Sequence, residues 1–206
     1  DGRAAIWLMD GLTPTGTNQI LNAASGWSAA HVADLSGDSK ADIVWQHTDG
    51  SVGVWLMNGN AMASGSGILG AGTGWSVAAV ADFDGDGLQD FAITERTAGP
   101  SVVWYRRTPP GWRRSVIDAR PTPIEAGACA ADVDRDGDLD LVAGGDHRST
   151  EVWWWENPGP RLDLARPWTR RPIKTAGAPK HHDLTFGDVD GDGAGDLVFW
   201  NQGART

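Results

Sequence analysis

The sequence predicts an all-β protein built from four copies of one unit, and three features support this prediction. An aspartate-rich nonapeptide recurs at 34–42, 82–90, 132–140 and 188–196, with starts 48, 50 and 56 residues apart. Short apolar runs alternate with clusters of glycine, proline, asparagine and aspartate, which is typical of strands joined by turns. No 3.6-residue period is sustained, so we expect almost no helix. A period near 50 residues with four strands per unit favours a β-propeller of four-stranded blades.

Each unit offers four candidate strands in a constant order around its nonapeptide. The first strand enters the nonapeptide, the second leaves it, the third carries tryptophan, and the fourth is more polar. We expect first strands at 77–82, 128–132 and 184–188, second strands at 90–94, 139–143 and 196–200, third strands at 52–57, 102–106 and 151–155, and fourth strands at 113–117 and 169–174. Side chains alternate along a strand, so the run Trp153 to Trp155 is expected to leave at least one indole partly exposed.

The two ends of the chain each carry half of a unit. Residues 3–9 and 17–22 correspond to third and fourth strands, whereas 183–188 and 196–200 correspond to first and second strands. Pairing these ends would cover strand edges that otherwise invite aggregation. We therefore predict a single domain over residues 1–206, with four blades and the last blade closed by the N-terminal strands. Two chains that form an eight-bladed ring are the alternative.

The charge of the chain argues for metal ions and against nucleic acid. The formal net charge is -10, whereas binding to phosphates requires lysine and arginine. Sixteen of the 27 acidic residues lie in the four nonapeptides, which makes the acidity a metal signature. Cys129 is the only cysteine, so no intrachain disulfide can form. The chain has no signal-peptide pattern and no apolar run near 18 residues, which predicts a soluble protein.

The nonapeptides have the ligand spacing of a loop that binds a hard cation. Side-chain oxygens recur at positions 1, 3, 5 and 9, a backbone carbonyl is available at position 7, and position 6 is mostly glycine. Carboxylates this close together repel one another unless a cation neutralises them. Oxygen ligands in this pattern are typical of calcium. A structural role is expected, because no loop has the glutamate at position 12 of an EF-hand.

The segments DLSGDSKAD, DFDGDGLQD, DVDRDGDLD and DVDGDGAGD, with their flanking strands, resemble the FG-GAP or VCBS repeat family. This family includes the calcium-loop blades of integrin alpha-chain propellers and of many bacterial extracellular proteins. In the first half, IWLMDG and GWS resemble bacterial VCBS blades. In the second half, WWENP and HHD are similar to propellers of bacterial sugar lyases and dehydratases. Rings of this family usually have about seven blades, whereas this chain offers four. The difference between the halves leaves an engineered or chimeric propeller as an alternative.

Transferred residue by residue, the resemblance implies up to four calcium ions. The implied ligands are Asp34, Ser36, Asp38, Lys40 and Asp42 in the first loop, Asp82, Asp84, Asp86, Leu88 and Asp90 in the second, Asp132, Asp134, Asp136, Asp138 and Asp140 in the third, and Asp188, Asp190, Asp192, Ala194 and Asp196 in the fourth. Position 7 contributes its carbonyl, so the carboxylate of Asp138 is expected to point to solvent. The first loop is expected to bind calcium most weakly, because Ser36 replaces a carboxylate and Lys40 adds an ammonium.

Two other groups of residues are candidates for binding or catalysis. Trp27 and Trp75 lie in GWS turns before first strands, where an indole face could stack on a sugar. His181 and His182 precede the first strand of the fourth unit, and histidine could act there as a base. Packing within the propeller and polar loop contacts are the simpler explanations of these residues. Sequence patterns of serine, cysteine, phosphate-loop and zinc enzymes are absent.

Together these observations predict a calcium-stabilised extracellular propeller that acts as a non-enzymatic binding or structural module. The expected ligand is a glycan or a protein, and the expected state is a monomer or a homodimer without nucleic-acid or membrane partners. Loops of this kind fill where calcium is millimolar, which favours a secreted protein. One alternative is a fragment or relative of a polysaccharide lyase or sugar dehydratase propeller. Another is an engineered propeller with no selected ligand.

Overall fold

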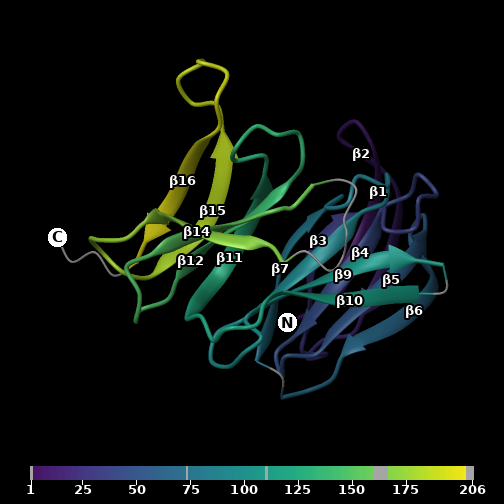
Figure 1. Ribbon diagram of the computed structural model, residues 1–206. Helices are drawn as coiled ribbons and strands as arrows, with labels where there is room; N and C mark the ends of the chain where they lie inside the picture. Colours follow the sequence, from purple (N-terminus) through teal and green to yellow (C-terminus); the bar gives the residue numbers. More distant parts are fainter. Residues whose placement is uncertain (1, 73, 110, 160–166, 203–206) are drawn as a thin grey trace. The chain divides into compact units, whose positions relative to one another are not determined.

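The computed structural model describes residues 2–72, 74–109, 111–159 and 167–202, and these residues contain sixteen strands and no helix. All the strand pairs with a defined register are antiparallel, and the strands form five separate sheets (Figure 1). The prediction of an all-β, repetitive chain is therefore confirmed. Within the described residues, no helix has the length and apolarity needed to cross a membrane. The chain forms two compact units, Asp1–Val77 and Ala78–Thr206.

The first unit contains a two-stranded sheet and a four-stranded sheet with the order β3-β4-β5-β6. Its strands are β1 (Ala4–Asp10), β2 (Thr13–Leu21), β3 (Trp27–Ala33), β4 (Asp42–His47), β5 (Val52–Asn58) and β6 (Ala61–Leu69). Ile43, Trp45 and Met57 form one buried cluster, against which partly buried side chains of β1 and β2 pack. The strand β6 lies at the sheet edge and is mostly exposed, in keeping with its serines and glycines.

The second unit contains two four-stranded sheets, with the orders β10-β9-β8-β7 and β11-β12-β13-β14, and a two-stranded sheet of β15 and β16. Its strands are β7 (Trp75–Ala81), which crosses the boundary between the units, β8 (Asp90–Glu95), β9 (Val102–Thr108), β10 (Gly111–Asp118), β11 (Ile124–Ala131), β12 (Asp140–Gly145), β13 (Val152–Glu156), β14 (Thr169–Lys174), β15 (His181–Gly187) and β16 (Asp196–Asn201). Every described repeat thus has the predicted strand order. Strand β11 begins four residues earlier than expected, because a register shift between Ile124 and Ala128 lets the strand continue past Gly127.

The expectation that one indole of β13 would be partly exposed is wrong. Trp153, Trp154 and Trp155 are 5%, 9% and 0% exposed. The predicted alternation itself is correct, since Trp153 and Trp155 pack in one apolar cluster and Trp154 packs in another with Leu184. Both faces of this strand are covered, which alternation along the sequence alone does not indicate.

The two terminal hairpins are the incomplete parts of the fold. Among the described residues, β1 pairs only with β2, and β16 pairs only with β15. The other three repeats each have four paired strands. The closure of a ring by these hairpins therefore remains a prediction.

Candidate metal loops and a polar cluster

Each nonapeptide forms the turn between the first and second strands of its repeat. In three of the four loops the structure brings acidic side chains together, with one ligand atom from each residue within 4.8 Å of the others. These groups are Asp82, Asp84 and Asp86 in the second loop, Asp132, Asp134 and Asp136 in the third, and Asp188, Asp190 and Asp196 in the fourth. The remaining predicted side-chain ligands lie outside these groups: Asp192 is in the fourth loop, whereas Asp90 and Asp140 are the first residues of β8 and β12.

The carboxylate at position 1 shapes each loop by accepting backbone hydrogen bonds from within it. Asp82 accepts the N–H of Asp86 at 3.1 Å and that of Gly87 at 2.9 Å. Gly87 has a φ of +88°, a conformation that glycine adopts without strain. In the first loop the same place is taken by Ser39 with a φ of +66°. The turn is therefore encoded locally, by an aspartate and usually a glycine five residues later.

The aspartate at position 9 of the first three loops accepts a backbone N–H group from the end of the third strand or from the residue just after it. Asp140 accepts the N–H of Val133 at 3.0 Å and the N–H of Asn157 at 2.8 Å. Asp42 does the same in the first unit, with the N–H groups of Leu35 and Met57. Asp42, Asp90 and Asp140 are all fully buried. These aspartates thus hold loop, second strand and third strand together, a role that the loop pattern did not reveal.

The buried carboxyls of the loops favour a bound cation. Burial is the main cause that raises the pKa of Asp90 to about 7 and that of Asp140 to about 6. Burial, with the charges of Asp136 and Asp140, also raises the pKa of Asp138 to about 7. At neutral pH, a buried carboxyl with such a raised pKa either holds a proton or requires a positive charge beside it. A divalent cation would supply that charge.

The expectation that the Asp138 carboxylate points to solvent is wrong. Asp138 is only 6% exposed, and neither of its carboxylate oxygens has a hydrogen-bond partner among the described residues. The segment after β13 lies against it, since a Cβ placed on Gly159 would be 3.6 Å from Asp138 Oδ2. The sequence between the loop and this segment gives no sign of that contact, which spans about 20 residues.

The first loop has the least favourable ligand set for a cation. Lys40 Nζ lies 3.2 Å from Asp38 Oδ2, and both side chains are about half exposed. The four backbone N–H groups from Ser36 to Ser39 all donate to the carboxylate of Asp34. The expectation that this loop binds calcium most weakly stays a prediction.

The two candidate histidines have different surroundings. His181 is completely buried, with Nδ1 3.1 Å from the carbonyl oxygen of Gly145 and Nε2 2.9 Å from Lys174 Nζ. Burial is the main cause that lowers the pKa of His181, so a neutral ring accepts from the lysine. Both ring nitrogens are engaged, which indicates a structural role. His182 is partly exposed, and its Nε2 lies 3.6 Å from Glu125 Oε2.

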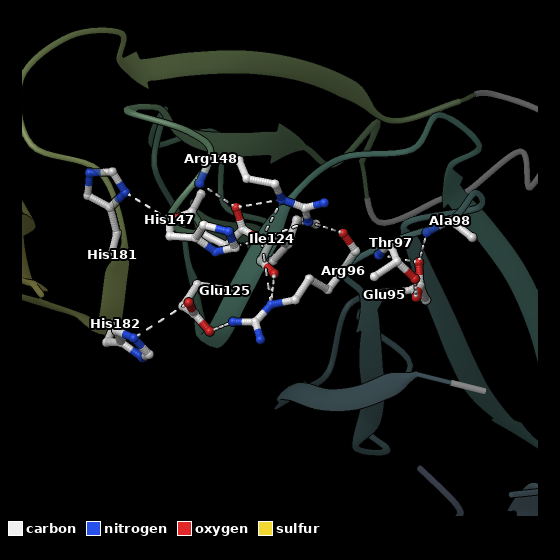
Figure 2. Close-up of polar contacts among 12 residues, drawn as sticks. Glu95, Arg96, Thr97, Ala98, Ile124, Glu125, His147, Arg148, His181 and His182 are labelled. Carbon is white, nitrogen blue, oxygen red and sulfur yellow. Dashed lines mark hydrogen bonds and ion pairs between the residues drawn. The ribbon is translucent and has the colours of Figure 1, made fainter. Parts of the chain in front are cut away.

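Glu125 and His182 belong to a polar cluster that draws on residues of three repeats (Figure 2). Arg96 forms an ion pair with Glu125, and Arg148 Nη2 lies 2.7 Å from Asp146 Oδ2. Arg148 also donates to the carbonyl oxygen of Arg96 at 2.9 Å. Burial pushes the pKa of Asp146 upward, but the hydrogen bonds from Arg148 outweigh it and hold that pKa below its ordinary value.

The buried carboxylates of this cluster are therefore matched by guanidinium groups, as in a network that connects neighbouring strands. Nothing in the sequence indicated Arg96, Glu125, Asp146 and Arg148 as members of a site. They lie up to 52 residues apart and form no motif, so no local signal could have identified them.

The two candidate tryptophans line separate cavities in the first unit. Trp27 lies in an apolar cavity of about 410 Å³, whose lining includes Trp45, Trp55 and Gly67. Trp75 lies in a more polar cavity of about 310 Å³, beside Gln46 and His47. The structure therefore separates the two residues that the GWS motif had grouped.

A family profile described as FG-GAP-like repeat matches the chain three times, over residues 35–93, 82–143 and 132–199. Each match contains two successive loops or their flanking strands, and together the matches cover most of the chain. No curated protein sequence matches this chain.

Proposed function

Because the chain belongs to the FG-GAP-like repeat family, we propose that it is a calcium-stabilised propeller module that binds a ligand outside the cytoplasm. The observation that carries this proposal is the convergence of three carboxylates in each of three loops, at the same place in each repeat. Calcium suits these loops because it takes six to eight oxygen ligands in flexible geometry. The ion would join the first and second strands of each repeat. An extracellular setting supplies calcium at the concentration that weak loops require.

The calcium sites can be tested by isothermal titration of EDTA-stripped and dialysed protein with calcium chloride. We expect at least two ions per chain, held by the third and fourth loops. The variant Asp132→Asn/Asp188→Asn should lose these ions, because each substitution removes a charge from position 1. If the wild type gives no heat of calcium binding, or if the double variant gives the same heat as the wild type, the proposed metal sites are wrong.

We propose further that the chain is one ring of four blades, closed by pairing of β16 with β1. Val198 is 52% exposed in β16, whereas the equivalent Val44 of β4 is completely buried beside its partner Val54 of β5. The register of β4 with β5, carried over to the termini, pairs Val198 with Ile6. Exposed Trp7 and Trp200 at these hairpins support the same pairing, since large apolar side chains favour burial. Two chains paired into an eight-bladed ring remain the alternative.

For the ligand we propose a glycan, bound in the tryptophan-lined cavity of the first unit. About 410 Å³ is within the size range of small-molecule sites, and its nine lining residues are all uncharged. The side chains of Trp27 and Trp55 are half-buried and line this cavity, where an indole could stack on the C–H surface of a sugar ring. The neighbouring edge strand β6 has peptide groups without a strand partner, which could bind hydroxyls. A neutral sugar fits this lining better than an acidic one.

The cavity can be tested by tryptophan fluorescence with glucose, galactose, mannose and N-acetylglucosamine. Gly67→Leu should abolish any response, because a side chain at Gly67 has free space and would fill the cavity. Gly70→Leu is the matched control, since Gly70 is equally uncrowded but outside the lining. Equal responses in the two variants, or no response to any of the four sugars, would contradict the glycan site.

The proposed module is non-enzymatic. His181 has both ring nitrogens engaged, and His182 faces a glutamate that is already paired with Arg96. This arrangement supports a structural explanation of the histidine pair better than a catalytic one.

A further inference from the structure

One position of the third strand differs in charge among the repeats, and it lies next to the metal loops. The backbone N–H groups of Met57, Arg107 and Asn157 each donate to the position-9 aspartate of their repeat. The residues just before them are therefore equivalent. They are Leu56, Arg106 and Glu156, which are neutral, positive and negative.

Arg106 places its guanidinium within the second loop. Its Nε lies 2.5 Å from Asp84 Oδ2, and its Nη2 lies 3.7 Å from Asp86 Oδ2. Asp84 and Asp86 are two of the three converging acids of this loop. The side chain of Asp84 is only 4% exposed, so the carboxylate of this ion pair is shielded from water, whereas Arg106 is partly exposed. The guanidinium thus neutralises the carboxylates that calcium would need.

The third loop has the opposite arrangement. Glu156 occupies the equivalent position and forms an ion pair with Arg171 at 2.5 Å, on the partly exposed side of the strand. No cationic side chain forms an ion pair with the acids of the third or fourth loop among the described ion pairs. The charge of Arg171 also acts on Asp134, but Arg171 is paired with Glu156. The second loop therefore differs from them by a resident positive charge, although its nonapeptide DFDGDGLQD keeps every acid of the pattern.

We infer that Arg106 acts as a built-in cation of the second loop, which as a result binds calcium more weakly than the third and fourth loops. This inference rests on the proposed calcium function. Calcium can enter the second loop only by displacing the guanidinium from a buried carboxylate, and breaking such a pair is unfavourable. The same pair holds the loop together when calcium is absent.

The test compares calcium titrations of the wild-type chain, Arg106→Leu and Arg107→Leu. The two variants remove the same charge from neighbouring residues of β9, but Arg107 contacts the Trp112 ring at 5.2 Å and has no ion pair with the loop. Leucine was chosen for Arg106 because Leu56 occupies the equivalent position in the first repeat. In Arg106→Leu we expect the calcium dissociation constant of one site to fall by about tenfold or more, since the substitution removes a positive charge within 4 Å of the loop carboxylates. Arg107→Leu should bind like the wild type.

Two further variants locate the effect and guard against a folding defect. Adding Asp86→Asn to Arg106→Leu should abolish the gain, which assigns it to the second loop. Arg106→Gln removes the charge but keeps a polar side chain beside Asp84, and it should show the same gain if the leucine variant is unstable.

The possible outcomes separate this inference from the proposed function. If the wild type binds calcium and both Arg106 variants bind it no more tightly than Arg107→Leu, the inference is wrong and the calcium function stands. If none of the proteins binds calcium, both are wrong.

Discussion

Removal of calcium with EDTA is expected to lower the melting temperature of this protein by about 10 to 20 °C. An ion that binds only the folded chain stabilises it by about 2.7 kcal/mol when its concentration is 100 times the dissociation constant. Two such ions, in the third and fourth loops, would contribute about 5 kcal/mol. In a domain of this size each kcal/mol changes the melting temperature by about 2 to 4 °C.

The measurement is thermal unfolding followed by circular dichroism, in EDTA and in calcium chloride at about 100 times the dissociation constant that the titration gives. Asp132→Asn/Asp188→Asn is the control, and its melting temperature should respond to EDTA much less than that of the wild type, because only the weaker loops remain. Magnesium should restore little stability, because it demands a tight octahedral shell and dehydrates reluctantly. An identical melting temperature in calcium and in EDTA would show that the loops do not use the ion to stabilise the fold.

Cysteines introduced at Ile6 and Val198 are expected to form a disulfide within one chain. These side chains would face each other across β1 and β16 if the termini pair as β4 and β5 do. The bond would close a loop of about 190 residues, which corresponds to about 5 kcal/mol in the chain-entropy account. The melting temperature of the oxidised variant should therefore rise by about 10 °C or more over the reduced one.

The experiment uses a Cys129→Ala background, because Cys129 is the only native cysteine. Ala5→Cys/Val198→Cys is the matched control, since Ala5 points to the opposite face of the strand from Ile6. Non-reducing electrophoresis and mass spectrometry give the result. A cross-linked species of 21.8 kDa indicates ring closure within one chain. A species of twice that mass indicates the paired ring, and equal cross-linking in both variants would contradict the predicted register.

The features that the sequence alone determines are those that depend on neighbouring residues. The nonapeptides could be recognised because a position-1 aspartate and the backbone it binds lie within five residues of each other, as in Asp82 and Gly87. The strand order follows from apolar runs and the turns between them, and it was correct in every described repeat. The agreement for β14, Thr169–Lys174, extends to both of its ends. The family assignment depends on the same local pattern.

The tertiary structure alone decides what surrounds these loops. The burial of Asp138, the engagement of both nitrogens of His181 and the guanidinium of Arg106 beside Asp84 all involve residues from other strands. The polar cluster of Arg96 and Arg148 joins residues 52 positions apart. Repetition in the sequence makes the second, third and fourth loops look equivalent, because it records the ligands and not their neighbours. Packing places the positive Arg106 against the second loop and the negative Glu156 near the third, and Coulomb interactions with these side chains make the two loops unequal.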